Sequence, residues 1–472
     1  MSSSLAARSP SAFKPRGPGG QLNVVSGGHT QQAACFAAVT DDPLSGAFTR
    51  KTGVHAGMSG KQVEEGAIPA LLDRLRGTKR TGPTTAYVHM PYCESKCLYC
   101  GFFGGKYTKQ SGSDYVEALI REIESEAHYA NVTSSPINAL YLGGGTPTAY
   151  QPHELTRLLK TLRACLPLAN DCEITVEGRI HNMTDERIEA CLEGGANRFS
   201  IGVQSFDTSI RRRLGRFSSK EEVCSRLTAL ASYNQAAVII DLMYGLPGQT
   251  LEHWEQDIAA FLELSLDGVD LYQLNIFPGG AMFKNIEAGK LAVPATLAEQ
   301  GRFFERGVGL MQRARCRRLS MSHWGRTARE RNLYNPMAKS RTNCLQYGAG
   351  AGGSQQGWFM HNDSGVGRYI ERCHKNEKPI AMMAAPPEDL AVMRVILRQL
   401  EECRLNLGDV ELALAQSTSA PNARELYAPL LENWEEAGLI TWDGSWIELT
   451  LAGQFWQVNL AQALINWQRH KE

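Results

Sequence analysis

Short apolar runs alternate with amphipathic stretches between Thr84 and Pro278, and this alternation most constrains the fold. The apolar runs predict strands at 86–90, 139–142, 173–176, 198–203, 238–243 and 270–276. The stretches between them predict helices at 113–130, 152–166, 184–193, 220–233 and 251–264. Strands that alternate with helices predict β/α units around a parallel sheet, here an α/β fold built on a partial (β/α)6 barrel of TIM type. Such barrels carry their chemistry at the carboxyl ends of the strands.

The chain has 472 residues, so we expect one large core with appendages. Residues 1–40 are rich in Ser, Ala, Gly and Pro and predict a disordered tail, with a transit peptide as the alternative. An N-terminal extension (41–83), the core barrel (84–280) and a linking region on the substrate side (281–380) follow. Residues 381–472 predict a winged-helix-like domain, with helices at 387–400, 408–416, 423–437 and 451–467 and a hairpin at 439–449.

Composition excludes some classes of function. Lys and Arg total 49, as do Asp and Glu, and this balance argues against a general nucleic-acid binder. Twelve cysteines without a secretory leader predict a reducing, cytoplasmic location. No uninterrupted apolar run approaches the roughly 18 residues of a membrane span, so none is expected.

Three cysteines, Cys93, Cys97 and Cys100, follow the first predicted strand. Their spacing holds three thiolates on one tight loop, enough for three corners of a [4Fe-4S] cluster. No fourth cysteine follows at short range, so one iron stays open for an outside ligand. An open iron beside S-adenosylmethionine (SAM) is the arrangement that cleaves SAM to a 5′-deoxyadenosyl radical. Zinc, or three unrelated buried thiols, is the alternative, but zinc motifs usually supply two pairs of ligands.

Polar or glycine residues also stand at the ends of the next strands. The run of three glycines at 143–145, before Thr146, would let a backbone with free N–H groups approach the methionine part of SAM. Glu177 could accept from an ammonium, Gln204 could donate and accept, and Asp241 could bind ribose hydroxyls. Each could equally be an ordinary turn or a satisfied strand-end group, but their regular placement favours a ligand site.

Taken in order, these motifs resemble the radical SAM superfamily, in the branch of oxygen-independent coproporphyrinogen oxidase. The shared segments are Tyr-x-His-x-Pro-Tyr-Cys, Gly-Gly-Gly-Thr-Pro, Arg-Phe-Ser-Ile-Gly-Val-Gln-Ser-Phe and Asp-Leu-Met-Tyr-Gly-Leu-Pro-Gly-Gln-Thr. The resemblance implies that the three cysteines hold the cluster and that Tyr87, Gly144 and Glu177 contact the SAM on the open iron. It further implies a second SAM site, lined by Tyr99, Gly145, Thr146, Gln204, Arg216, Asp241 and Asn275.

Three departures from the motifs of the oxidases indicate a more specific family. Phe102 stands where the oxidases carry another cysteine, Gly178-Arg179 follows Glu177 where most relatives have small residues and proline, and the segment 322–335 differs as well. These features resemble the anaerobic heme-utilisation methyltransferases called anaerobilin synthases. That resemblance implies methyl transfer to heme, ring opening with release of iron, and a flavodoxin-type or similar low-potential electron donor. A coproporphyrinogen III dehydrogenase and a heme chaperone without redox catalysis are the alternatives.

The segment 322–335 is a candidate heme contact. Arg326, Arg329 and Arg331 could donate to the two propionates, and helical spacing favours the first two because it puts them on one face. Trp324 could stack on the macrocycle, and His323 could ligate iron or shuttle a proton, although His89 and His361 are equal candidates as iron ligands. A solvated, charged helix with a buried Trp is the alternative.

Overall fold

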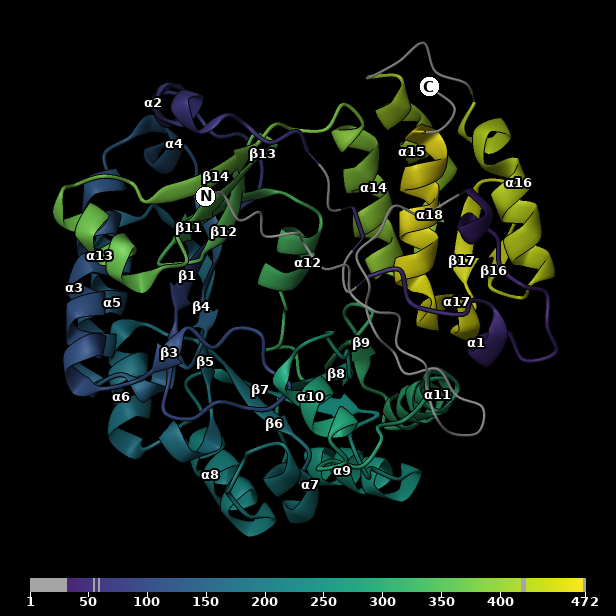
Figure 1. The fold of residues 1–472 in the computed structure, drawn as a ribbon, viewed down its shortest axis with the longest axis horizontal. Helices are drawn as coiled ribbons and strands as arrows, with labels where there is room; N and C mark the ends of the chain where they lie inside the picture. Colours follow the sequence, from purple (N-terminus) through teal and green to yellow (C-terminus); the bar gives the residue numbers. More distant parts are fainter. Residues whose placement is uncertain (1–31, 54–55, 58–59, 417–421, 470–472) are drawn as a thin grey trace, which may run out of the picture.

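The computed structural model describes residues 32–53, 56–57, 60–416 and 422–469, so most of the predicted tail lies outside the described residues. Two lobes lie side by side in Figure 1. The larger contains a sheet with helices around it, and the smaller is the C-terminal helical domain, drawn in yellow-green. Within the described residues no helix is long and apolar enough to cross a membrane.

The six predicted strands are all present and form a parallel sheet in chain order. They are β1 (Thr84–Met90), β4 (Ile137–Gly144), β5 (Leu168–Gly178), β6 (Arg198–Gln204), β7 (Ala237–Tyr244) and β8 (Gly268–Gln273). Helices α3 (Lys109–Glu126), α5 (Pro152–Cys165), α6 (Asp185–Gly194), α8 (Lys220–Ser232) and α9 (Leu251–Glu263) cover the outside of this sheet (Figure 1). The predicted partial barrel is therefore confirmed.

One predicted helix start is wrong. The first helix was expected at residue 113, but α3 begins at Lys109 because Thr108 and Ser111 form a reciprocal capping box. The Thr108 hydroxyl accepts from the Ser111 N–H, and the Ser111 hydroxyl accepts from the Thr108 N–H, both at 3.1 Å. A serine in place of the usual Glu or Gln hid this start in the sequence.

The linking region extends the sheet at both edges, which the sequence did not predict. Beside β1 lie β11 (Asn343–Tyr347), β12 (Gly352–Gln355), β13 (Trp358–Asn362) and β14 (Ile380–Ala384), and beside β8 lie β10 (His323–Gly325) and β9 (Arg317–Arg318). Only β11 among these is parallel to its barrel neighbour. The same region forms α10 (Ala281–Glu287), α11 (Leu297–Arg313), α12 (Tyr334–Lys339) and α13 (Val366–His374). The twelve strands make one open sheet.

The C-terminal domain has the predicted winged-helix-like order. Its elements are α14 (Leu390–Glu401), β15 (Arg404–Asn406), α15 (Leu407–Leu414), α16 (Ala423–Glu436), β16 (Ile440–Trp442), β17 (Trp446–Leu449), α17 (Leu451–Phe455) and α18 (Gln457–Arg469). The hairpin turn is closed by Asp443, which accepts from the N–H groups of Ser445 and Trp446 at 2.8 and 2.7 Å. The single last helix expected at 451–467 is two helices that break at Trp456.

The chain before α1 (Pro43–Gly46) packs on this C-terminal domain. Cys35 is fully buried, and its carbonyl accepts from the indole N–H of Trp434 at 3.0 Å. The Ala37 N–H donates to Asn433 Oδ1 at 2.7 Å. Residues 35 and 37 of the predicted tail thus bond to Trp434 and Asn433, which lie 396 or more residues away along the chain and leave no local signal.

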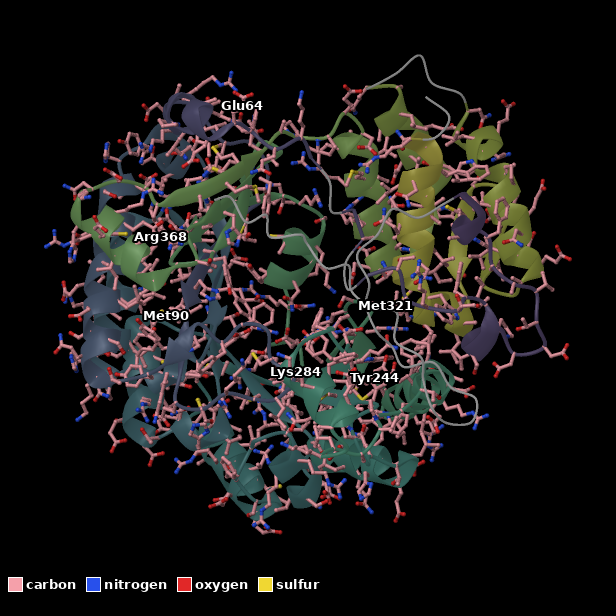
Figure 2. All side chains as sticks on the ribbon, in the orientation of Figure 1. Glu64, Met90, Tyr244, Lys284, Met321 and Arg368 are labelled. Atoms are coloured by element: carbon pink, nitrogen blue, oxygen red, sulfur yellow. The ribbon has the colours of Figure 1, made fainter. Side chains whose placement is uncertain are left out.

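Each lobe has its own large apolar core. One lies between the barrel strands and the outer helices, and the other is enclosed by the helices of the C-terminal domain. Side chains fill the space between the sheet and its helices in Figure 2, where Met90 marks the end of β1 and Tyr244 the end of β7. All twelve cysteines lie in the described part of the chain and none is in a disulfide.

Candidate active site

The cysteine loop begins directly after β1, at the carboxyl end of the barrel, as predicted. Cys93 lies in the short strand β2 (Tyr92–Cys93), which pairs with β3 (Gly105–Lys106). The Leu98 N–H donates to the Leu214 carbonyl at 3.2 Å, and the Leu98 carbonyl accepts from the Met282 N–H at 3.0 Å. Backbone bonds therefore fix the loop to the segment after β6 and to α10.

The three thiols fit an iron–sulfur cluster better than a single metal ion. Cys93 and Cys97 are buried and Cys100 is half-buried, and burial raises the pKa of the Cys93 and Cys100 thiols while the Arg179 guanidinium partly lowers it. No three His, Cys, Asp or Glu side chains in the described ranges converge on one point that could hold an ion. A zinc ion needs such convergence. A cubane does not, because each cysteine ligates a different iron.

Glu177 is held in place by two hydrogen bonds at the end of β5. Its Oε1 accepts from the Tyr141 hydroxyl at 2.7 Å, and its Oε2 accepts from the Gly144 N–H at 3.1 Å. Burial raises the pKa of Glu177, and the two hydrogen bonds offset part of that rise. Tyr87 on β1 lies near this carboxylate, because burial, and then the negative charge of Glu177, raise the pKa of its hydroxyl. The three residues expected at the iron-bound SAM, Tyr87, Gly144 and Glu177, thus lie together.

The glycine run is required by the protein's own packing. A Cβ at Gly143 would meet the Glu177 carboxylate, and a Cβ at Gly144, where φ is +102°, would meet the His89 ring. The N–H groups of Gly145 and Thr146 donate to the carbonyls of Met90 and Tyr92, at 2.7 and 2.9 Å. The expectation of free N–H groups is therefore wrong, because the cysteine loop and Glu177 already take them. An ammonium, whose N–H groups could donate to Glu177, fits this end of the sheet better than a carboxylate does.

Four residues expected at a second SAM site form another group. The Arg216 guanidinium donates twice to the Tyr99 hydroxyl, at 3.1 and 2.7 Å, and once to the Gly202 carbonyl. Gln204 is buried and has a φ of +71°, a strained conformation for a residue other than glycine. Burial, and then the charges of Asp270 and Glu177, raise the pKa of Asp241 to about 7.

Of the three remaining residues of that predicted site, Gly145 belongs to the glycine run described above, and Thr146 and Asn275 also lie at strand ends. Thr146 donates from its hydroxyl to the Cys93 sulfur at 3.3 Å, which ties the glycine turn to the cysteine loop. Asn275 follows β8, and its side chain donates to the Gln273 carbonyl at 3.4 Å. Both groups of predicted cofactor residues are therefore gathered at the carboxyl end of one barrel.

Two tyrosines that the sequence analysis missed face the same interior. Tyr272 on β8 is 38% exposed, and burial of its hydroxyl, followed by the charges of Asp270, Asp241 and Glu177, raises its pKa. Tyr334 on α12 stacks on Tyr141, with ring centroids 4.5 Å apart. No local pattern marks Tyr334, because α12 reaches the barrel only through the tertiary fold.

The candidate heme histidine belongs to a buried ion network. His323 on β10 is fully buried, with Nδ1 2.8 Å from Asp270 and Nε2 2.9 Å from Glu330. Glu330 also accepts from Arg198 at 3.0 Å. Burial disfavours a charged imidazole, but the two carboxylates outweigh it and raise the pKa of His323 to about 9. Because both ring nitrogens face carboxylates, the predicted roles as iron ligand or as proton shuttle to heme do not fit.

The arginines of this segment are engaged at the amino end of the barrel, opposite the cysteine loop. Arg326 donates to the Leu262 carbonyl, Arg329 to Asn234 Oδ1 and the Ala236 carbonyl, and Arg331 to Asp171. Ala236 immediately precedes β7, and Asp171 lies near the start of β5.

The segment forms the strand β10, a loop and the start of α12, and Trp324 is only 2% exposed, with Arg318 over its ring. These contacts within the protein do not support the predicted heme contacts of Trp324, Arg326 and Arg329, which stay predictions.

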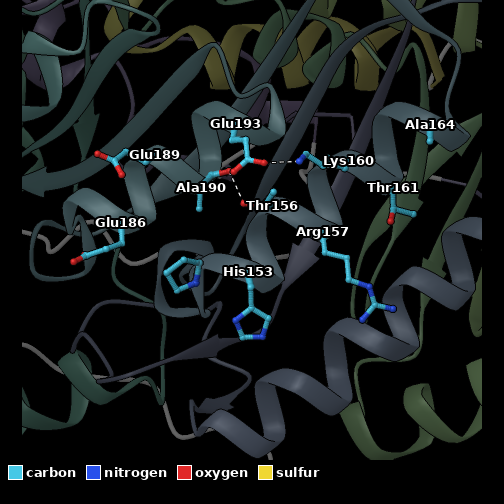
Figure 3. A pocket seen from close by; sticks show the side chains of 11 residues that line it. His153, Thr156, Arg157, Lys160, Thr161, Ala164, Glu186, Glu189, Ala190 and Glu193 are labelled. Atoms are coloured by element: carbon cyan, nitrogen blue, oxygen red, sulfur yellow. Dashed lines mark hydrogen bonds and ion pairs between the residues drawn. The ribbon is translucent and has the colours of Figure 1, made fainter.

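A surface hollow of about 780 Å³ lies between α5 and α6, outside the barrel (Figure 3). Lys160 pairs with Glu193 across it at 2.5 Å, and the Thr156 hydroxyl donates to the Ala190 carbonyl at 3.0 Å. None of the predicted site residues lines this hollow. The hollow therefore lies apart from the predicted site at the carboxyl end of the barrel.

Comparison with known proteins gives consistent results. The family model of the radical SAM superfamily matches residues 87–261. The chain is 40% identical over 408 residues to an anaerobilin synthase of Escherichia coli O157:H7, which covers 84% of this chain and 89% of the relative. It is 28% identical over 290 residues to the heme chaperone HemW of Bacillus subtilis, which covers 61% and 75%. The solved structure of coproporphyrinogen III oxidase (HemN) from Escherichia coli aligns with a TM-score of 0.69 at 23% identity, covering 84% and 93%, and supports the fold.

Proposed function

Because the chain belongs to the radical SAM superfamily, in the family of the anaerobilin synthases, we propose that it methylates heme and opens the tetrapyrrole ring, with release of iron. The observation that carries this proposal is the 40% identity to an anaerobilin synthase over 84% of the chain. The family implies a [4Fe-4S] cluster and SAM, and the cysteine loop and Glu177 provide residues that fit both.

Different residues of this chain would hold the cluster and the SAM that binds to it. Cys93, Cys97 and Cys100 would hold the cluster, which when bound supplies the electron that cleaves SAM. Glu177 would accept from the SAM ammonium, and the bonds from Tyr141 and Gly144 keep its carboxylate aimed. Burial lowers the pKa of His89 to about 4, so this imidazole is neutral at pH 7 and adds no charge beside the ligand.

Methyl transfer needs a second SAM, which we propose binds near Asp241. Tyr99, Gln204 and Arg216 lie on the loops and strand ends next to this carboxylate, and the charges of Asp241 and Glu177 act on each other. Hydrogen bonds from ribose hydroxyls would favour the ionised form of Asp241, which burial disfavours. Two SAM molecules held this close would bring the radical to the methyl donor without diffusion.

We propose that heme binds at the open carboxyl end, since the amino end is filled by the network of Arg198, Glu330 and His323. Aromatic side chains are exposed on three segments that follow barrel elements there: Phe102 at 68%, Phe217 at 76% and Phe277 at 46%. Exposed large apolar side chains gathered near a site mark a surface that binds an apolar partner. A flat macrocycle has two apolar faces and fits such a rim.

The same rim suits an acidic, flavodoxin-type electron donor. Lys96 in the cysteine loop and Arg212 are exposed cations, and Gly215 lies close against Lys96, with a Cβ there 3.4 Å from the Lys96 carbonyl. Opposite charges steer the encounter of two proteins. The twelve unpaired cysteines support a reducing compartment, and we propose the cytoplasm.

The proposal is tested by anaerobic incubation of the reconstituted protein with heme, SAM and reduced flavodoxin, followed by mass spectrometry. A methylated, linear tetrapyrrole is expected. Parallel incubation with coproporphyrinogen III tests the dehydrogenase alternative, for which a divinyl product would appear. Heme recovered unchanged but bound, with no SAM cleavage linked to it, would favour the chaperone and reject the proposal.

A further inference from the structure

Arg179 is a buried cation at the cysteine loop. It follows β5, two residues after Glu177, and is 7% exposed. Its Nη1 donates to the carbonyl of Ser95 at 2.7 Å, so the guanidinium reaches the turn between Cys93 and Cys97. Its backbone N–H donates to the Thr148 hydroxyl at 3.4 Å, which fixes the base of the side chain.

No carboxylate in the described part of the chain pairs with Arg179. The Nε of its guanidinium is buried without a hydrogen-bond partner. Glu94, the acidic residue of the loop, lies 3.3 Å from His181 and 3.9 Å from Arg187 and forms no ion pair with Arg179 in the described part of the chain. Burying an uncompensated charge is costly, so a guanidinium in this position requires a negative group nearby.

The negative group that fits is the cluster itself. The guanidinium of Arg179 is held 2.7 Å from the Ser95 carbonyl, in the turn that carries Cys93 on one side and Cys97 on the other. A cluster held by three thiolates is negative, and each added electron makes it more so. A cation in this weakly screened position interacts more favourably with the reduced cluster than with the oxidised one.

We propose that Arg179 is a positioning residue of the cluster, which braces the loop through Ser95 and raises the reduction potential. No bond is made or broken in this role. The inference depends on the cluster alone and holds whatever the substrate is, so its failure and a failure of the heme proposal are distinguishable.

The test compares the midpoint potential of the reconstituted wild type with Arg179→Gln and Arg179→Lys, followed by EPR in an anaerobic redox titration. We expect Arg179→Gln to lower the ratio of reduced to oxidised cluster at least tenfold at a given potential, a shift of 59 mV for one electron. Arg179→Lys keeps the charge and should stay within that tenfold limit. Arg226→Gln removes an exposed charge that pairs with Asp185, and it should change nothing.

Iron and sulfide content are measured beside each titration. A Gln variant with a full cluster and an unchanged potential would overturn the proposal. If the Gln variant holds no cluster, the Lys variant decides: a potential near that of the wild type supports the role of the charge. A tenfold loss in the Lys variant, with its cluster content intact, would overturn it.

Discussion

The two ends of the barrel use similar charged residues in opposite ways. At the amino end Arg198, Glu330, His323 and Asp270 are each buried and bonded to one another. At the carboxyl end Arg179 is buried and pairs with no carboxylate among the described residues. Asp241 lies beside Asp270 in the sheet, where burial raises its pKa and the charges of Arg198 and Arg216 offset only part of that rise. Charges that satisfy each other hold a fold together, whereas charges left unpaired in the interior await a ligand. The same contrast separates the arginines at 326–331 from Arg179.

The largest effect is expected where the carboxyl end would lose a cluster ligand. Cys97→Ala should abolish both the brown absorbance of the cluster and SAM cleavage, because no spare cysteine lies on the loop. The matched control is Cys165→Ala on α5, which should keep both, since Cys165 is half-buried outside the barrel. Iron content, absorbance and deoxyadenosine release measure the outcome, and an intact cluster in Cys97→Ala would contradict the assignment.

At the amino end the expected loss is one of stability. Glu330→Gln leaves Arg198 and His323 buried beside a neutral amide, and breaking a buried ion pair in this way costs about 3–5 kcal/mol. Denaturant unfolding of the apo-protein measures the change. Glu193→Gln removes an exposed pair with Lys160 and should cost less than about 1 kcal/mol. Equal losses of unfolding free energy in the two variants would mean that the buried network stabilises the fold no more than an exposed ion pair does.

The pH dependence of the free energy of unfolding is a second test of the same network. The pKa of His323 is about 9 in the fold, against an ordinary value of 6.5, so its stabilising effect is complete below pH 6.5 and is lost as the pH rises through 9. Because one pKa unit corresponds to about 1.4 kcal/mol, the effect is about 3 kcal/mol at most. The unfolding free energy of wild type should fall between pH 6.5 and 9. That fall should be smaller in His323→Gln, and an unchanged slope would contradict the ion pairs.

Back at the carboxyl end, two substitutions separate the proposed SAM sites. Asp241→Asn should reduce methyl transfer more than deoxyadenosine formation, whereas Glu177→Gln should reduce both. A hydrogen bond to a charged group contributes about 1.5–3 kcal/mol, so each loss should be roughly tenfold to a hundredfold. Product ratios from single-turnover reactions measure the split, and equal loss of both products in both variants would refute it.

The smallest effect is expected from the arginines that the sequence suggested for heme. Arg326→Ala and Arg329→Ala should leave heme affinity unchanged, because their partners are at the opposite end from the open interior. Exposed positions of this kind usually change stability by no more than about 0.5 kcal/mol. Heme titration measures the affinity, and a tenfold weakening in either variant would restore the earlier interpretation.

Local patterns were sufficient for much of the fold and for part of the site. The six barrel strands and the positions of Cys93, Glu177 and Asp241 could be predicted because each strand is a short apolar run with its polar residue at or near the end. The strands of the linking region were missed because they pair across the sheet, as β11 does with β1. Tyr334 was missed because α12 reaches the barrel only through the tertiary fold.

The sequence by itself determined the barrel, the cysteine loop and the family, since spacing along the chain fixes which groups follow which strand. The tertiary structure decided which charges are satisfied. Arg179 and Arg329 look alike in the sequence, but one lies unpaired beside the cysteines and the other bonds to Asn234 and Ala236, remote in the chain. The reason is physical: the energy of a buried charge depends on partners brought together only by folding.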